Sequence, residues 1–87
     1  MVYTLYFTKK ALKDSLKIKE AGFKDKTCKL LILLEQNPYQ IPPSYEKLIG
    51  DLEGAYSRRI NIQHRLVYQV NEHEKYVKIL RMWTHYE

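Results

Sequence analysis

Hydrophobic residues change their spacing along the 87-residue chain, and these changes predict its secondary structure. Residues 2–7 are rich in β-branched and aromatic side chains, which is typical of a short strand. Apolar and small residues then recur at helical spacing and predict helices over residues 9–21 and about 25–36. Thr8 is a suitable N-cap for the first helix, and Gly22 a suitable stop. Because so short a turn separates the helices, we expect them to form an antiparallel hairpin.

The second half of the chain has the spacing of strands. Asn37 and Pro38 end the second helix, and a long irregular connection follows up to about Glu53. Connections of this length are usually functional or disordered, and we expect apolar residues to pin this one to the body, namely Tyr45, Leu48, Ile49 and Leu52. Three strand-like segments complete the chain, at about 55–62, 65–71 and 75–83.

The order β-α-α-β-β-β predicts one α+β domain over residues 1–87. The turns between the last three strands are short enough for hairpins, so we expect an antiparallel sheet. The helical hairpin would pack on one face of this sheet and leave the other face partly open.

The net charge of the chain indicates which kinds of partner it binds. With 15 Lys and Arg against 10 Asp and Glu, the formal net charge is +5, which favours a polyanion or an acidic protein. Lysine dominates the first third, whereas all four arginines lie between Arg58 and Arg81. Arginine binds phosphate through two parallel hydrogen bonds, so the arginine cluster is the more informative part of this charge.

Cysteine and histidine usage argues against several kinds of site. The single cysteine, Cys28, excludes an intramolecular disulfide and a cysteine-built zinc site, and we expect it to be a buried structural thiol on the second helix. The three histidines lack metal-ligand spacing, so no metal or other cofactor is expected. We find no signal-peptide or membrane-spanning pattern, so we expect a cytoplasmic protein with no membrane partner.

Several side chains outside the predicted core have catalytic chemistry. Arg58 and Arg59 are neighbours on a predicted strand and therefore point to opposite faces, so only one of them faces the open side with Arg65. The pattern alone leaves open which one does so. His64 and His73 fall in predicted turns and need no function. The remaining candidates are a loop glutamate and the end of the chain, namely Glu46, His85 and Tyr86.

Together these residues match the chemistry of RNA cleavage. Attack by the RNA 2′-hydroxyl needs a base to accept its proton, cations to stabilise the phosphorane, and an acid to protonate the leaving oxygen. Glutamate, arginine and histidine supply these roles without a metal, and a tyrosine can contact phosphate or a base. The residues therefore favour a small metal-independent ribonuclease. A non-catalytic basic module that binds RNA or a partner protein is the alternative.

Residues 54–68, Gly-Ala-Tyr-Ser-Arg-Arg-Ile-Asn-Ile-Gln-His-Arg-Leu-Val-Tyr, resemble the core signature of the YoeB/Txe toxins of the RelE superfamily. The family's opening Thr-x-x-Ala-x-x-Asp is matched by Thr8, Ala11 and Asp14, and its terminal His-Tyr by residues 85–86. Its Pro-Glu-Pro-Leu-Lys loop is matched loosely at residues 45–48, without the two prolines. The resemblance spans essentially the whole chain.

This resemblance implies a RelE/YoeB-like fold and an endoribonuclease that cleaves mRNA in the ribosomal A site. It implies that Glu46 is the general base, His85 the general acid, and Arg65 the cation that stabilises the phosphorane. Arg59, with Arg58 beside it, would bind the phosphate, and Tyr86 would position the substrate.

The resemblance also implies partners. They are a cognate antitoxin that covers the site, operator DNA bound only through the antitoxin complex, and a second copy of the chain in a homodimer. Related ParE-type toxins inhibit DNA gyrase instead. They generally lack the matched glutamate and the terminal His-Tyr, so the ribonuclease is favoured.

Overall fold

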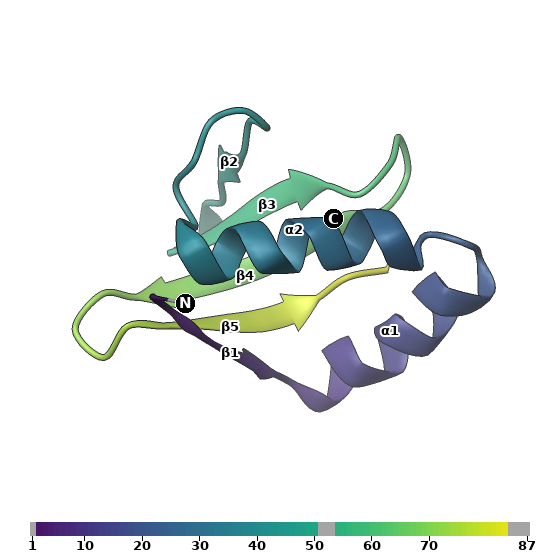
Figure 1. Ribbon diagram of the computed structural model, residues 1–87, viewed down its shortest axis with the longest axis horizontal. Helices are drawn as coiled ribbons and strands as arrows, with labels where there is room; N and C mark the ends of the chain where they lie inside the picture. The colour runs from purple at the N-terminus through teal and green to yellow at the C-terminus, as the bar shows by residue number, and fades with distance from the viewer. Residues whose placement is uncertain (1, 51–53, 84–87) are drawn as a thin grey trace.

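The computed structural model describes residues 2–50 and 54–83. Its helices and strands follow in the order β1 (Thr4–Phe7), α1 (Lys9–Glu20), α2 (Lys24–Gln36), β2 (Glu46–Lys47), β3 (Ala55–Arg59), β4 (Arg65–Asn71) and β5 (Tyr76–Arg81) (Figure 1).

The strands form one mixed sheet in the order β1-β5-β4-β3-β2. Strands β3, β4 and β5 are antiparallel neighbours, as expected, and the α+β class is confirmed. Strand β2 is also antiparallel to β3. The expectation of a purely antiparallel sheet is wrong at β1, which runs parallel to β5 with Thr4 opposite Tyr76. Two helices separate β1 from the next strand, so no hairpin dictates its direction, and it lies along the free edge of β5. The two-residue strand β2 was not predicted because it is too short to show a period.

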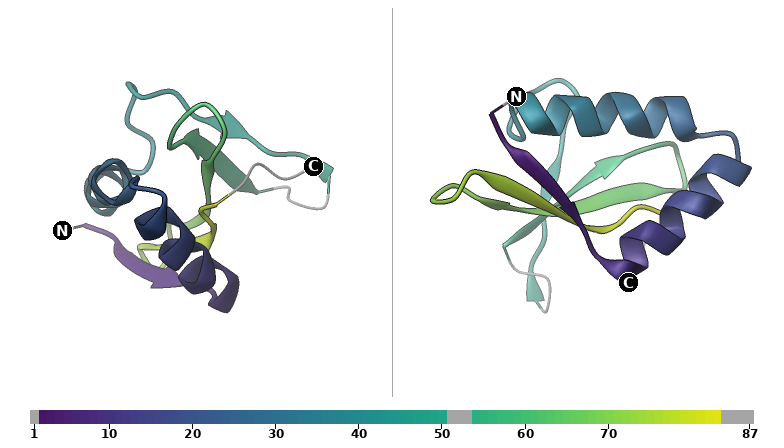
Figure 2. Two further views of the ribbon diagram at one scale, coloured as in Figure 1. Left: turned by 90° about the vertical axis from the view of Figure 1, so that its right-hand side faces the viewer. Right: turned by 60° about the horizontal axis from the view of Figure 1, so that its bottom comes forward.

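Both helices cover one face of the sheet, and they diverge as a V from the turn between them (Figure 2). Gly22 in that turn has φ +84°, a backbone conformation that favours glycine. The core between the layers contains residues of α1, α2, β4 and β5 that are at most 2% exposed, namely Ala11, Ile18, Leu34, Leu66, Tyr68, Val77 and Ile79. No helix in the described part of the chain has the length and hydropathy needed to cross a membrane.

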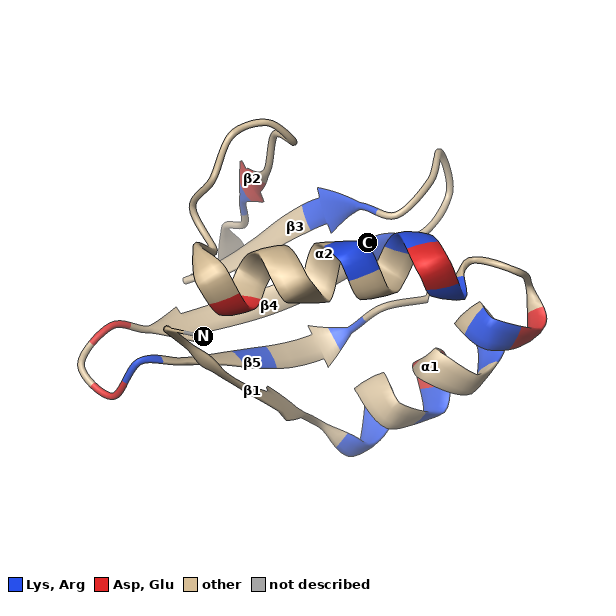
Figure 3. Ribbon diagram, in the orientation of Figure 1, with Lys and Arg blue, Asp and Glu red and all other residues tan. Residues whose placement is uncertain are grey.

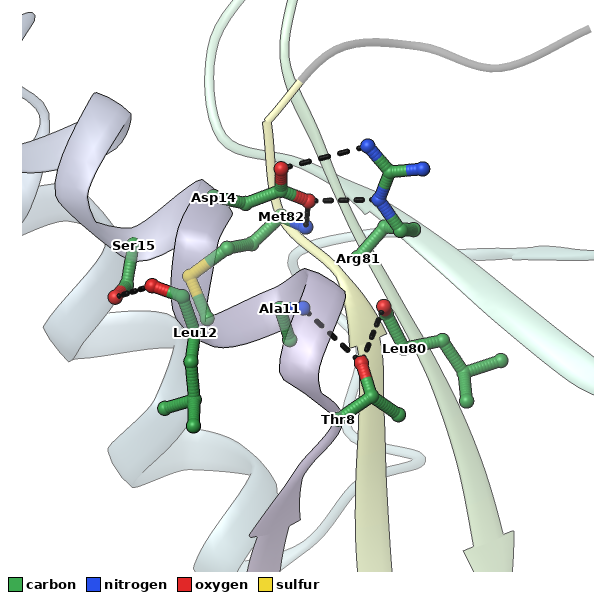
Figure 4. A network of polar contacts seen from close by, with 8 residues as sticks. All are labelled: Thr8, Ala11, Leu12, Asp14, Ser15, Leu80, Arg81 and Met82. Carbon is green, nitrogen blue, oxygen red and sulfur yellow. Dashed lines mark hydrogen bonds and ion pairs between the residues drawn. The ribbon is translucent and has the colours of Figure 1, made fainter.

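The start of α1 is tied to the end of β5 (Figure 4). Thr8 is the N-cap, as predicted, because its Oγ1 accepts a hydrogen bond from the Ala11 backbone N–H at 3.0 Å. The same hydroxyl donates to the carbonyl of Leu80 at 2.9 Å. Further along α1, the Asp14 carboxylate accepts from Arg81 Nε at 2.8 Å and from the Met82 backbone N–H at 3.1 Å. Of the opening motif, Thr8 and Asp14 thus join α1 to the end of β5, and Ala11 packs in the core.

The expectation that Cys28 is buried is wrong, because its side chain is exposed. The buried residues of α2 are Thr27 and Leu34. Position 28 is about 100° further around the helix than position 27 and therefore lies on the flank of the packed stripe. Figure 3 shows that lysine and arginine residues colour much of α1, the first part of α2 and the end of β3.

Candidate active site

The sheet face that is turned away from the helices holds the candidate site. Glu46 of β2 lies opposite Ser57 of β3, and Arg59 of β3 lies opposite Arg65 of β4. Ser57 and Arg59 are two residues apart on one strand, so their side chains point to the same face. These four residues line a hollow of about 260 Å³ together with Pro43, Ser44 and Tyr45. The structure therefore brings together three residues that the sequence nominated, namely Glu46, Arg59 and Arg65.

Within the hollow, Arg65 Nη1 lies 3.5 Å from Glu46 Oε1. The Glu46 side chain is 67% exposed and the Arg65 side chain 23% exposed, so the carboxylate is open to a ligand while the cation is partly desolvated. Arg59 and Arg65 are directly opposite each other, and like charges in this arrangement repel. A bound anion would relieve that repulsion. The hollow is therefore suited to a phosphate with a carboxylate at its side.

Arg58 has a different role from the one that we expected. It is 1% exposed, and its Nε donates to the Tyr68 hydroxyl at 2.9 Å. Its Nη2 donates to the carbonyls of Pro38 and Gln40 at 2.8 and 2.9 Å, and its Nη1 donates to the carbonyl of Pro43. The expectation that Arg58 binds phosphate beside Arg59 is therefore wrong. The guanidinium instead ties the loop after α2 to the sheet, and Arg59 is the neighbour that faces the hollow.

The loop that carries Glu46 is anchored in part as predicted. Tyr45 packs edge-on against Tyr56 with ring centroids 5.4 Å apart, and the Leu48 backbone N–H donates to the Ala55 carbonyl at 3.0 Å. Ile49, another expected anchor, is 86% exposed, so that expectation is wrong. Leu52 lies outside the described residues. Arg58 and the pairing of β2 with β3 attach the loop as well, and neither contact was predicted.

Two of the predicted catalytic residues, His85 and Tyr86, lie outside the described residues. The chain leading to them passes Trp83, whose ring stacks on His64 with centroids 3.9 Å apart and an interplanar angle of 17°. His64 is 5% exposed and also packs against Phe23 in the turn between the helices. The sequence pattern assigns no role to His64, because an isolated turn histidine carries no local signal of such packing.

Ser57 is a buried polar residue of the hollow that the prediction missed. It is 2% exposed, and its Oγ has no hydrogen-bond partner within residues 2–50 and 54–83. The available signal was its position two residues before Arg59 on the same strand, which places it on the same face. Among the described residues there is no group of three His, Cys, Asp or Glu side chains that could hold a metal ion.

Comparison with known proteins relates this site to a family. A family model described as a YoeB-like toxin of a bacterial type II toxin–antitoxin system matches residues 7–86. Among solved structures, the YoeB–YefM complex from Staphylococcus aureus is similar at 32% identity, with 97% of this chain and 98% of that chain covered and a TM-score of 0.81. The YoeB dimer from the same organism is similar at 31% identity, with 99% and 100% covered and a TM-score of 0.80.

A YoeB/ParE toxin from Agrobacterium tumefaciens is similar at 26% identity, with 95% of this chain and 99% of that chain covered and a TM-score of 0.86. No curated protein sequence matched.

Proposed function

The chain belongs to the YoeB-like toxins of bacterial type II toxin–antitoxin systems, and we propose that it is an endoribonuclease that cleaves mRNA in the ribosomal A site and so inhibits translation. The observation that carries this proposal is the hollow in which an exposed carboxylate, Glu46, lies beside two arginines, Arg59 and Arg65. This arrangement combines a proton acceptor with a site for a phosphate.

The proposed reaction uses the RNA's own 2′-hydroxyl as nucleophile. Glu46 accepts the proton of that hydroxyl while the oxygen attacks the adjacent phosphorus. Arg65 and Arg59 stabilise the negative charge of the phosphorane. The bond to the 5′-oxygen then breaks, His85 donates a proton to it, and a 2′,3′-cyclic phosphate remains. The roles of His85 and of Tyr86, which positions the substrate, rest on the sequence resemblance.

The reaction as proposed needs no metal ion. Two guanidiniums share the hollow with the carboxylate, and their charge would repel a cation while stabilising the phosphorane directly.

The proposed partners follow from the relatives. The Staphylococcus aureus YoeB is in complex with YefM, which supports a cognate antitoxin as the partner that neutralises this chain. The net charge of +5 suits an acidic antitoxin segment laid over the site. The YoeB dimer supports a homodimer. We propose that the chain binds operator DNA only as part of the antitoxin complex. We propose the cytoplasm as its location, because translating ribosomes are found there.

A gyrase inhibitor is the second candidate, because one similar structure is named a YoeB/ParE toxin. A gyrase inhibitor or a non-catalytic basic module could use the arginines, but it has no need for Glu46 beside them. The ribonuclease therefore accounts for more of the hollow.

Two variants test the proposal in a translation reaction with a defined mRNA. Glu46→Gln and His85→Ala should each lower the rate of mRNA cleavage by roughly 10²- to 10⁴-fold, since each removes a proton-transfer group. Glu20→Gln, which changes an exposed carboxylate on α1 in the same way, should cleave like the wild type. Undiminished cleavage by either active-site variant would contradict its assigned role. Inhibition of gyrase without RNA cleavage would favour the second candidate.

A further inference from the structure

Ser57 has a buried hydroxyl that the proposed mechanism does not use. Its Oγ has no hydrogen-bond partner within residues 2–50 and 54–83, although the residue is only 2% exposed. A buried hydroxyl without a partner loses its bonds to water and gains none in return, so it destabilises the folded chain. Alanine at this position would avoid that loss. The presence of the hydroxyl therefore indicates a hydrogen bond that forms in another state of the molecule.

The surroundings of Ser57 identify the partner. Glu46 is its direct cross-strand neighbour, and side chains in this relation have Cβ atoms about 5 Å apart. Arg59 and Arg65, which also line the hollow, carry donors only. The Glu46 carboxylate is therefore the strong acceptor beside the hydroxyl. Side chains of directly opposed residues at this spacing can form a hydrogen bond with each other.

The charges in the hollow explain why the contact is absent in the free chain. Here the Glu46 carboxylate lies against the Arg65 guanidinium at 3.5 Å. A phosphate that enters the hollow competes for the same guanidinium, because a phosphate binds arginine through two parallel hydrogen bonds. The carboxylate then loses its cation and needs another donor to hold it in place.

We propose that Ser57 is a positioning residue for Glu46. When a phosphate binds Arg65, the Ser57 hydroxyl donates a hydrogen bond to the Glu46 carboxylate and holds it toward the 2′-hydroxyl of the RNA. This inference rests on the proposed ribonuclease function. It adds a switch between two partners of Glu46: Arg65 in the free chain and Ser57 in the RNA-bound chain.

Kinetics of the Ser57→Ala variant test this role. The value of kcat for RNA cleavage should fall roughly tenfold or more, since a hydrogen bond to a charged group is lost, while KM stays within about twofold. Ser57→Thr retains the hydroxyl and should recover most of kcat. Thr4→Val removes a hydroxyl from an exposed residue of β1, outside the hollow, and should cleave like the wild type. A wild-type kcat in Ser57→Ala would overturn the inference.

Thermal melting separates this role from a structural one. Because the hydroxyl has no partner to lose within the described chain, Ser57→Ala should melt at or above the wild-type temperature. A melting temperature lowered by more than about 5 °C would mean that the hydroxyl is already bonded in the free chain, and would contradict the inference.

A crystal structure with inorganic phosphate in the hollow needs no turnover and so tests Ser57 independently of the nuclease proposal. The expected result is the Ser57 hydroxyl within hydrogen-bond distance of the Glu46 carboxylate, with Arg65 on the phosphate. Phosphate on Arg65 with Ser57 Oγ still unbonded would overturn the inference, even if the chain cleaves RNA. Failure of phosphate to displace Glu46 from Arg65 would overturn it as well.

Discussion

The buried carboxylate of Asp14 in α1 accepts a hydrogen bond of 2.8 Å from the Nε of Arg81, at the end of β5. The same Oδ2 atom accepts from the backbone N–H of Met82 at 3.1 Å. Asp14 is 2% exposed, whereas the Arg81 side chain is 38% exposed. The first helix therefore fixes the end of β5, the last strand before His85, which is the predicted general acid.

Asp14→Ala should destabilise the chain because it leaves the Met82 N–H and the Arg81 guanidinium without their acceptor. We expect a loss of about 2 kcal/mol in the free energy of unfolding and a melting temperature lower by about 10 °C, measured by thermal denaturation. Asp25→Ala removes an exposed carboxylate at the start of α2 and should cost less than half as much. Equal effects of the two substitutions would show that the contact at Asp14 contributes little.

Arg58 and Arg59 offer a matched pair of adjacent residues. Arg58→Lys keeps the charge but cannot reproduce the planar set of donors to Tyr68 and to the loop carbonyls, so we expect a loss of about 3 kcal/mol in urea denaturation. Arg59→Lys changes an exposed side chain and should alter stability by less than about 0.5 kcal/mol while slowing RNA cleavage. The reverse order of stabilities would contradict the assignment of the two faces.

Stability should fall at alkaline pH because of Tyr68. Burial raises the pKa of Tyr68 from 10.0 to about 12. A group with a raised pKa in the folded state contributes stability that is complete below pH 10 and is lost as the pH rises toward 12. The wild type should lose about 2 kcal/mol more than Tyr68→Phe over this interval, measured by urea denaturation at each pH. Parallel declines in the two proteins would rule out this origin.

The stack of His64 on Trp83 should contribute to stability through packing and not through a hydrogen bond. The Nδ1 atom of His64 has no partner in the described part of the chain, so His64→Phe should keep the melting temperature within a few degrees of the wild type. His64→Ala should lose about 1–2 kcal/mol because the ring contacts with Trp83 and Phe23 disappear. His73→Ala, at an exposed turn, is the control and should be neutral. A strongly destabilised His64→Phe would indicate a polar role for the imidazole.

The sequence predicts the local elements well because their signals are local. Helical spacing and the Thr8 cap place α1 within a residue of its observed end, and strand periodicity places β4 at residues 65–71 as observed. Pairing of distant segments has no such signal. The parallel position of β1 at the sheet edge depends on its pairing with β5, which is distant in sequence. The position of β2 likewise depends on its pairing with β3.

In the candidate site, too, the residue types could be predicted from the sequence but their spatial arrangement could not. Residue types and their order nominate Glu46, Arg59 and Arg65, and the fold brings them together in one hollow. The sequence does not decide between Arg58 and Arg59, because strand parity becomes fixed only when one face is packed on a core. Ser57 was missed for a related reason: serine is common at exposed positions, and only the register reveals that it is buried opposite Glu46.

Removal of one 2′-hydroxyl oxygen from the RNA tests most directly the central claim that the chain cleaves mRNA through attack by that hydroxyl. An mRNA with one 2′-deoxynucleotide at the scissile position, placed in the A site of a stalled ribosome, is compared with the all-ribose mRNA. The account predicts cleavage of the all-ribose mRNA to a 2′,3′-cyclic phosphate in the presence of a metal chelator that leaves the ribosome intact, and no cleavage at the deoxy position. Cleavage at the deoxy position, or no cleavage of either mRNA, would contradict it.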